Sequence, residues 1–182
     1  MNTAVIYKTK YGFTETYARW IAEDLGAELL ISDKVKPADL QNYSTLIFGG
    51  GLYAGSVSGI ATLTKNFESI KDKALYLFTV GAADVTDQKN IDSIRSSLCS
   101  VITPPMMQAI KIYHFRGGMK YSEMSLTHRA MMGMMIKMVR KKPESELRAE
   151  DKMMLETYGQ DVDFTDRQMI APLLEDIKTR TK

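Results

Sequence analysis

Short apolar runs alternate with amphipathic segments along most of this chain. Runs rich in β-branched and aromatic residues predict buried strands, at residues 4–7, 27–31, 45–48, 73–80 and 109–115. Apolar positions at helical spacing predict helices at residues 15–25, 58–67, 87–98 and 166–179. Strands that alternate with helices indicate an α/β fold, doubly wound, with a parallel sheet covered on both faces. Right-handed crossovers favour the strand order 2-1-3-4-5 for these five strands.

One long segment does not fit this alternation. Residues 116–164 lie between the fifth strand and the last helix, where a minimal fold of this class needs only a short connection. Helical spacing returns at residues 125–142 and 144–155. Pro104-Pro105 should interrupt the chain before the fifth strand. A Thr165-x-x-Gln168 capping box should open the last helix, and Pro172 should kink that helix or delay its start. We therefore expect one domain over residues 1–182, with 116–164 as a helical insertion.

The loop after the first strand is the best candidate for binding an anion. Free amides and the helix dipole at the start of residues 15–25 favour negative charge, Thr9 and Thr14 add hydroxyl groups, and Gly12 permits close approach. The loop is neither a Walker loop nor a three-glycine dinucleotide fingerprint. We interpret it as a phosphate cradle; the alternative is an ordinary strand-to-helix turn in which Thr14 caps the helix.

Two further loops should meet this one at the same edge of the sheet. The third strand ends in three glycines followed by Tyr53, and the fourth is followed by a loop that ends at Asp84. Carboxyl ends of neighbouring parallel strands converge in this topology. Tyr53 is either a binding-site aromatic or a surface tyrosine in a glycine-rich turn. Asp84 either faces a ligand or caps the next helix.

The first loop resembles the phosphate loop of the flavodoxins, Thr/Ser-x-Thr-Gly-x-Thr. Thr9, Gly12 and Thr14 match, and Tyr11 stands where flavodoxins usually carry Thr or Ser. The resemblance implies a flavodoxin-like fold that binds FMN, with the phosphate in the first loop and the flavin ring between the other two. The FMN contacts it implies are Thr9, Lys10, Tyr11, Gly12, Phe13, Thr14, Gly50, Gly51, Leu52, Tyr53, Ala54, Gly81, Ala82, Ala83 and Asp84.

The predicted helix at 125–142 combines a wide methionine-rich face with basic residues. Arg129, Lys137, Arg140 and Lys141 fall together on one side of it. Basic amphipathic helices bind membrane surfaces or partner proteins, and methionine adapts to irregular surfaces. The alternatives are packing onto the domain's own core and burial in a homodimer. Because the loops lie before residue 85, we expect the FMN site to form without this helix.

The insertion carries a second resemblance. Residues 117–121, 135–138 and 162–166 resemble menaquinone-dependent protoporphyrinogen dehydrogenases, which are flavodoxin-fold FMN enzymes with an insertion at this point. The resemblance implies oxidation of protoporphyrinogen IX in haem biosynthesis, with electrons passing to a quinone at the membrane. The redox partner would then be a quinone or a porphyrinogen-like small molecule.

Charge and cysteine content narrow the function classes. The net charge is only +2, which does not support nucleic-acid binding, and a lone Cys99 allows no internal disulfide. We expect a cytoplasmic protein, with contact at the inner face of the membrane left open. His114 and His128 show no metal or nucleophile spacing, so we expect structural roles for both.

The favoured function is an FMN-dependent oxidoreductase or electron-transfer flavoprotein in which the flavin carries the chemistry and no side chain need act as acid or base. The alternatives are the dehydrogenase above and a non-enzymatic interaction module.

Overall fold

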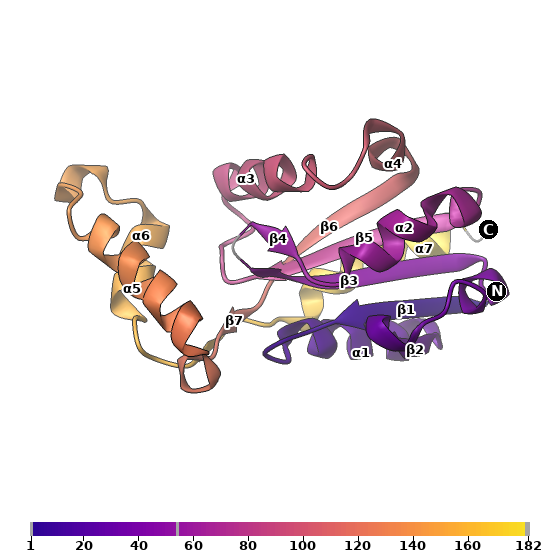
Figure 1. Ribbon diagram of the computed structural model, residues 1–182, viewed down its shortest axis with the longest axis horizontal. Coiled ribbons are helices and arrows are strands. Elements are labelled where there is room, and N and C mark those ends of the chain that lie inside the picture. Colours follow the sequence, from indigo (N-terminus) through magenta and orange to yellow (C-terminus); the bar gives the residue numbers. More distant parts are fainter. Residues whose placement is uncertain (1, 54, 181–182) are drawn as a thin grey trace.

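The computed structural model describes residues 2–53 and 55–180, and its centre is a twisted parallel sheet (Figure 1). The strand order is β2-β1-β3-β5-β6, which is the expected order 2-1-3-4-5 for the five predicted strands. A short β4 adds to β3 as an antiparallel hairpin partner. The strands are β1 Thr3–Lys8, β2 Glu28–Ile31, β3 Thr45–Tyr53, β4 Ser56–Val57, β5 Ala74–Gly81 and β6 Ile110–Arg116. The flavodoxin-like α/β fold is thus confirmed.

Helices cover both faces of the sheet, and each face has its own core. One core packs α1 and α7 against side chains such as Tyr76 and Phe78, and the other packs α2 and α3 against Leu75 and Leu77. Alternation along β5 sends successive side chains to opposite faces, which is why both cores share this strand. The helices of the two layers are α1 Phe13–Leu25, α2 Ile60–Ile70, α3 Gln88–Leu98, α4 Pro104–Ala109 and α7 Ala171–Arg180. Short 3-10 turns cover Ser32–Lys34 and Asp39–Asn42.

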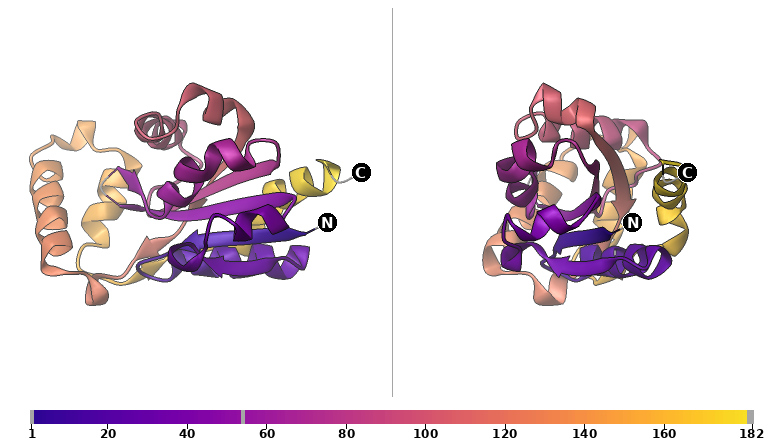
Figure 2. Two further views of the ribbon diagram at one scale, coloured as in Figure 1. Left: turned by 45° about the vertical axis from the view of Figure 1, so that its right-hand side comes forward. Right: turned by 90° about the vertical axis from the view of Figure 1, so that its right-hand side faces the viewer.

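The insertion leaves the carboxyl edge of the sheet and returns to it through a paired stalk. The outgoing β7 (Gly118–Met119) pairs antiparallel with the returning β8 (Val162–Asp163). Beyond the stalk come a 3-10 turn at Tyr121–Glu123, α5 (Leu126–Val139) and α6 (Ala149–Glu156). Figures 1 and 2 show α5 and α6 as a separate layer standing beyond the strand ends.

Several predicted element ends were wrong. β3 does not stop at Phe48 but runs through the three glycines to Tyr53. A side chain at Gly49 would lie 2.1 Å from the ring of Phe78 on the neighbouring β5, so this position of the strand requires glycine. The glycines thus make room within a strand instead of turning the chain. Pro104 does not interrupt the chain but opens α4, where a proline costs no helical hydrogen bond.

The insertion and the last helix also differ from expectation at their starts. Residues 144–155 are not one helix: a 3-10 turn at Glu144–Glu146 precedes α6. Asp166, and not Thr165, caps the 3-10 turn Arg167–Ile170 by accepting from the amide of Gln168. The delay expected from Pro172 is confirmed, since α7 begins only at Ala171.

His114 has the structural surroundings expected for it, since it lies on β6 and its ring is mostly enclosed. Its Nδ1 lies 2.7 Å from the hydroxyl of Thr79, and its Nε2 is buried and finds no partner within the described part of the chain. Burial, with help from nearby Arg95, lowers the pKa of His114 from 6.5 to about 4. The folded protein therefore holds this imidazole neutral where the unfolded chain would protonate it.

This difference predicts a loss of stability in mild acid. As pH falls from 7 to 4.5, the unfolded state binds a proton that folded His114 does not, which should cost about 2–3 kcal/mol of unfolding free energy. Urea unfolding at the two pH values measures it. His114→Asn is the control, because it should remove this part of the pH dependence. An equal pH dependence in parent and variant would contradict the assignment.

Candidate functional site

The first loop has a geometry suited to binding an anion at the start of α1. Gly12 is the residue that caps α1, at φ +89°, so Thr14 lies inside the helix and does not cap it as the alternative reading required. The hydroxyl of Thr9 accepts from the amide of Gly12 at 3.0 Å and holds the bend. The first amides of a helix have no intrahelical partner, so those of α1 remain available to a ligand beside the loop.

A lysine from the insertion lies next to this loop. A Cβ built on Gly12 would lie 3.8 Å from the Nζ atom of Lys120, which also stands over the ring of Phe13. Lys120 pairs with Glu123 at 3.3 Å on the surface of the insertion. Its charge adds to the positive end of the α1 dipole, so the loop, the helix and the insertion all favour a negatively charged group here.

Tyr53 lies against the first loop, at the end of β3. Its hydroxyl accepts from the amide of Lys10 at 3.2 Å, and its ring meets that of Tyr11 edge-on with centroids 5.7 Å apart. A side chain at Gly51 would lie 2.7 Å from the Tyr53 ring, which explains the glycine there. The binding-site reading of Tyr53 is thus favoured over that of a surface tyrosine.

Asp84 does not cap the following helix, because Asp87 does so by accepting from the amide of Lys89. Asp84 instead accepts from the amide and the hydroxyl of Thr86, at 2.9 and 2.8 Å. These bonds, aided by Arg116 at 3.5 Å, lower the pKa of the Asp84 carboxyl. Asp84 is therefore ionised, and its hydrogen bonds hold the conformation of the loop after β5.

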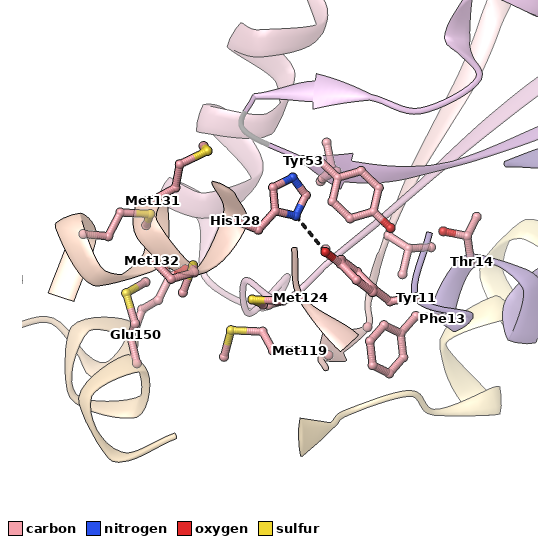
Figure 3. Close-up of a pocket in the computed structure, with 18 residues that line it drawn as sticks. Tyr11, Phe13, Thr14, Tyr53, Met119, Met124, His128, Met131, Met132 and Glu150 are labelled. Atoms are coloured by element: carbon pink, nitrogen blue, oxygen red, sulfur yellow. Dashed lines mark hydrogen bonds between the residues drawn. The ribbon is translucent and has the colours of Figure 1, made fainter. Parts of the chain in front are cut away.

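A cavity of about 290 Å³ opens at this edge, between the loops and the insertion (Figure 3). Seven of the predicted contacts line it: Tyr11, Phe13, Thr14, Leu52, Tyr53, Gly81 and Ala82. The others predicted, which do not line it, are Thr9, Lys10, Gly12, Gly50, Gly51, Ala83 and Asp84. Ala54 lies outside the residues that the structure describes. The cavity is close to the smallest size typical of small-molecule sites.

The rest of the cavity lining comes mostly from the insertion. The stalk contributes Gly117, Gly118 and Met119, and the helical part contributes Met124, His128, Met131, Met132, Met135, Glu150 and Met154. We expected the site to form without the helix at 125–142. The paired stalk instead folds α5 back toward the sheet edge, so that one cavity has walls from both. Gly117-Gly118 after the fifth strand, and the methionine pattern, are the sequence signals from which this wall could have been predicted.

Side-chain contacts also hold the insertion in this place, besides the stalk. Arg148, which caps α6, reaches Asp87 at 2.6 Å and Asn90 at 3.0 Å on α3. Arg116 stacks on Phe164 with its guanidinium 4.2 Å from the ring centroid. At the mouth of the cavity, Nδ1 of His128 lies 2.7 Å from the Tyr11 hydroxyl. The sequence predicted only a structural role for His128, whereas in the structure His128 is also part of the cavity wall.

The comparisons with known proteins agree with this architecture. A family model described as a flavodoxin domain matches residues 4–146. This chain belongs to the flavodoxin-domain family. An uncharacterized protein of Methanocaldococcus jannaschii is 38% identical over 56 residues, which is 30% of this chain and 37% of that protein's length.

Flavodoxins and a flavoprotein are among the similar solved structures. Oxidised flavodoxin 2 of Bacillus cereus matches with a TM-score of 0.44 and 15% identity, over 64% of this chain and 84% of its own. A flavoprotein of Lactobacillus acidophilus in complex with FMN matches with a TM-score of 0.43 and 14% identity, over 63% and 91%. Within residues 2–53 and 55–180, no helix has the length and apolar character needed to cross a membrane.

The stalk offers a test of how the cavity is built. In Gly118→Ala the new Cβ would lie 2.1 Å from the carbonyl oxygen of Val162 and 2.7 Å from the Phe13 ring, so β7 and β8 should separate. We expect a loss of about 1–3 kcal/mol in unfolding free energy, measured by urea denaturation.

The matched control is Gly133→Ala within α5, where the new Cβ would lie 3.4 Å from the Tyr158 hydroxyl. Alanine is the better helix former, so this variant should be neutral or more stable by up to about 1 kcal/mol. If Gly118→Ala is as stable as Gly133→Ala, the stalk is not tightly packed.

Proposed function

We propose that this protein binds FMN at the carboxyl edge of its sheet and uses it to exchange electrons with a small, flat, apolar molecule. The observation that carries the proposal is the shared cavity, in which the loops of a flavodoxin domain face a methionine-lined wall from the insertion. The loop from Thr9 to Thr14 would hold the phosphate, and Tyr53 and the loop after β5 would flank the ring. Bound FMN would supply the redox chemistry.

The residues present fit this cofactor. The α1 amides, the Gly12 bend and Lys120 make a positive setting for a phosphate, while the Tyr53 ring and the Gly81 backbone suit a flat heterocycle. The insertion wall then adds apolar, polarisable thioethers beside the ring position, and these contact aromatic molecules favourably. A large protein would contact the insertion before it reached the ring position. Such a wall therefore favours a small-molecule redox partner.

Quinones and porphyrinogens are the more specific candidates within this class. A quinone ring is flat and apolar, and the puckered macrocycle of a porphyrinogen presents apolar pyrrole rings, so both suit a wall of Met124, Met131 and Met132. A menaquinone-dependent protoporphyrinogen IX dehydrogenase is the enzyme that the sequence motifs of the insertion favour. A non-enzymatic module is the competing class, and bound flavin separates the two.

The first test of the proposal is cofactor binding. The purified protein should be yellow, with the absorption bands of oxidised FMN. Thr14→Ala should weaken FMN about ten- to a hundredfold, because Thr14 is buried, lines the cavity at the start of α1, and would lose a hydrogen bond to a charged phosphate. Fluorescence titration of the apoprotein with FMN measures the Kd.

Thr16→Ala is the control, since Thr16 lies on the same helix, does not line the cavity and bonds the Gly12 carbonyl. Its Kd should stay within about twofold of the parent. A colourless protein that takes up no added FMN would refute the proposal. An unchanged Kd in Thr14→Ala would refute only the assignment of the phosphate loop.

A peripheral contact with an anionic membrane is the second proposal, carried by the outer side of α5. Leu126, Met134 and Met138 are 84%, 62% and 60% exposed and do not line the cavity. Lys137, Arg140 and Lys141 lie on the same helix and the turn after it. Exposed methionines beside lysine and arginine suit the headgroup region of an anionic bilayer, which would also hold an apolar substrate.

Replacing both Met134 and Met138 with Gln should lower binding to phosphatidylglycerol vesicles about tenfold, through lost apolar burial, while FMN stays bound. Vesicle sedimentation measures the binding. The control variant replaces Ile31 and Val101, which are 41% and 43% exposed elsewhere on the protein, with Gln. If the parent binds no vesicles and the methionine variant elutes later from gel filtration, the surface is a homodimer interface instead.

A further inference from the structure

His128 joins the insertion to the first loop through both of its ring nitrogens. Its Nδ1 lies 2.7 Å from the Tyr11 hydroxyl, and its Nε2 lies 3.4 Å from the Nζ atom of Lys10. The ring also stacks on Tyr53, with centroids 6.2 Å apart and planes at 21°. Figure 3 shows His128 pointing from the insertion toward Tyr11 at the cavity.

The chemistry of the three groups fixes the direction of these hydrogen bonds. A lysine ammonium only donates, so Nε2 of His128 accepts from Lys10. A neutral imidazole with Nε2 as acceptor carries its proton on Nδ1, which therefore donates to the oxygen of Tyr11. The hydroxyl hydrogen of Tyr11 is then free to be donated to a ligand in the cavity.

The same three residues lead from solvent into the cavity. Lys10 is exposed, His128 is half-buried, and Tyr11 is 7% exposed and lines the cavity. Burial and the charge of Glu123 raise the pKa of Tyr11, so that it remains a phenol at neutral pH. Each member can therefore pass a proton to the next and recover one from behind.

We propose that Lys10, His128 and Tyr11 form a proton relay that delivers protons to a carbonyl-bearing substrate in the cavity. The inference rests on the proposed FMN-dependent function. In the two-electron reduction of a quinone-class acceptor, two electrons and one proton come from the reduced flavin. The second proton goes to a carbonyl oxygen of the acceptor as the O–H bond of Tyr11 breaks.

The relay is refilled with protons from solvent. The Nδ1 proton of His128 restores the Tyr11 hydroxyl, and the Lys10 ammonium protonates Nε2 of the same ring. Water returns a proton to the exposed lysine amine. The acceptor gains two electrons and two protons in all. His128 is then the Nε2–H tautomer, and it regains its starting form when Nε2 releases that proton to water and Nδ1 takes one up.

The insertion is what makes this relay, because His128 is its middle member. A flavodoxin core without residues 116–164 has no imidazole at this place. A carrier of single electrons has no need to protonate its acceptor, whereas an enzyme that reduces or oxidises a small molecule by two electrons does. The relay therefore ties the insertion to two-electron chemistry.

The test compares two oxidants of the photoreduced, FMN-bound protein by stopped-flow absorbance. 1,4-Naphthoquinone takes up two protons when it is reduced by two electrons to its hydroquinone, and ferricyanide takes single electrons without a proton. In His128→Ala the ratio of the naphthoquinone rate to the ferricyanide rate should fall about ten- to a hundredfold. Added imidazole should restore much of it by filling the vacated space. Thr127→Ala changes the exposed residue next to His128 in the chain and should keep the parental ratio.

Tyr11→Phe provides a second variant that keeps the aromatic ring, and its ratio should fall similarly without rescue by imidazole. A parental ratio in both variants, with flavin bound, overturns the relay and leaves the FMN proposal intact. A fall in His128→Ala that imidazole does not reverse, with a parental ratio in Tyr11→Phe, also overturns it, because His128 then only fastens the insertion. A parent that binds no flavin refutes the proposed function and the relay with it.

Discussion

The backbone hydrogen bonds of Gly117 hold together the parts on which the site depends. Its amide donates to the carbonyl of Gly81 at 2.6 Å, and its carbonyl accepts from the amide of Phe164 at 2.8 Å. The first bond links the start of the insertion to the loop after β5. The second bond links the end of the insertion to its start. A side chain at Gly117 would come within 2.7 Å of Val80, so only glycine allows this approach. The cavity exists because about fifty residues leave and re-enter the sheet at this one point.

Once the stalk is placed, polar contacts orient the insertion over the sheet edge. Arg148, which caps α6, pairs with Asp87, which caps α3, and His128 on α5 meets Tyr11 in the first loop. Exposed ion pairs contribute little stability each, so these contacts serve more to fix the position than to strengthen the fold. Ile136 and Val139 on α5 are buried, at 2% and 7% exposure.

This arrangement joins two kinds of chemistry in one small cavity. The sheet edge offers backbone amides, a helix amino terminus and aromatic rings, which suit a phosphate and a flat ring. The insertion offers thioethers and an imidazole, which suit an apolar partner and the movement of protons. The same helix leaves Met134 and Met138 exposed on its outer side, so that one element can both line the cavity and meet a surface.

Local pattern determined most of the sheet and its helices. The alternation of apolar strands with amphipathic helices decided the fold class and strand order, and the chemistry of Thr9, Gly12 and Thr14 marked the first loop, because these signals arise within a few neighbouring residues. Only the tertiary structure decided why residue 49 within β3 has to be glycine, since the reason lies on another strand, in the ring of Phe78. It likewise decided that His128 stands beside Tyr11, 117 positions away in the chain. Periodicity identifies which face of a helix is apolar, but what that face contacts depends on long-range contacts that no local pattern encodes.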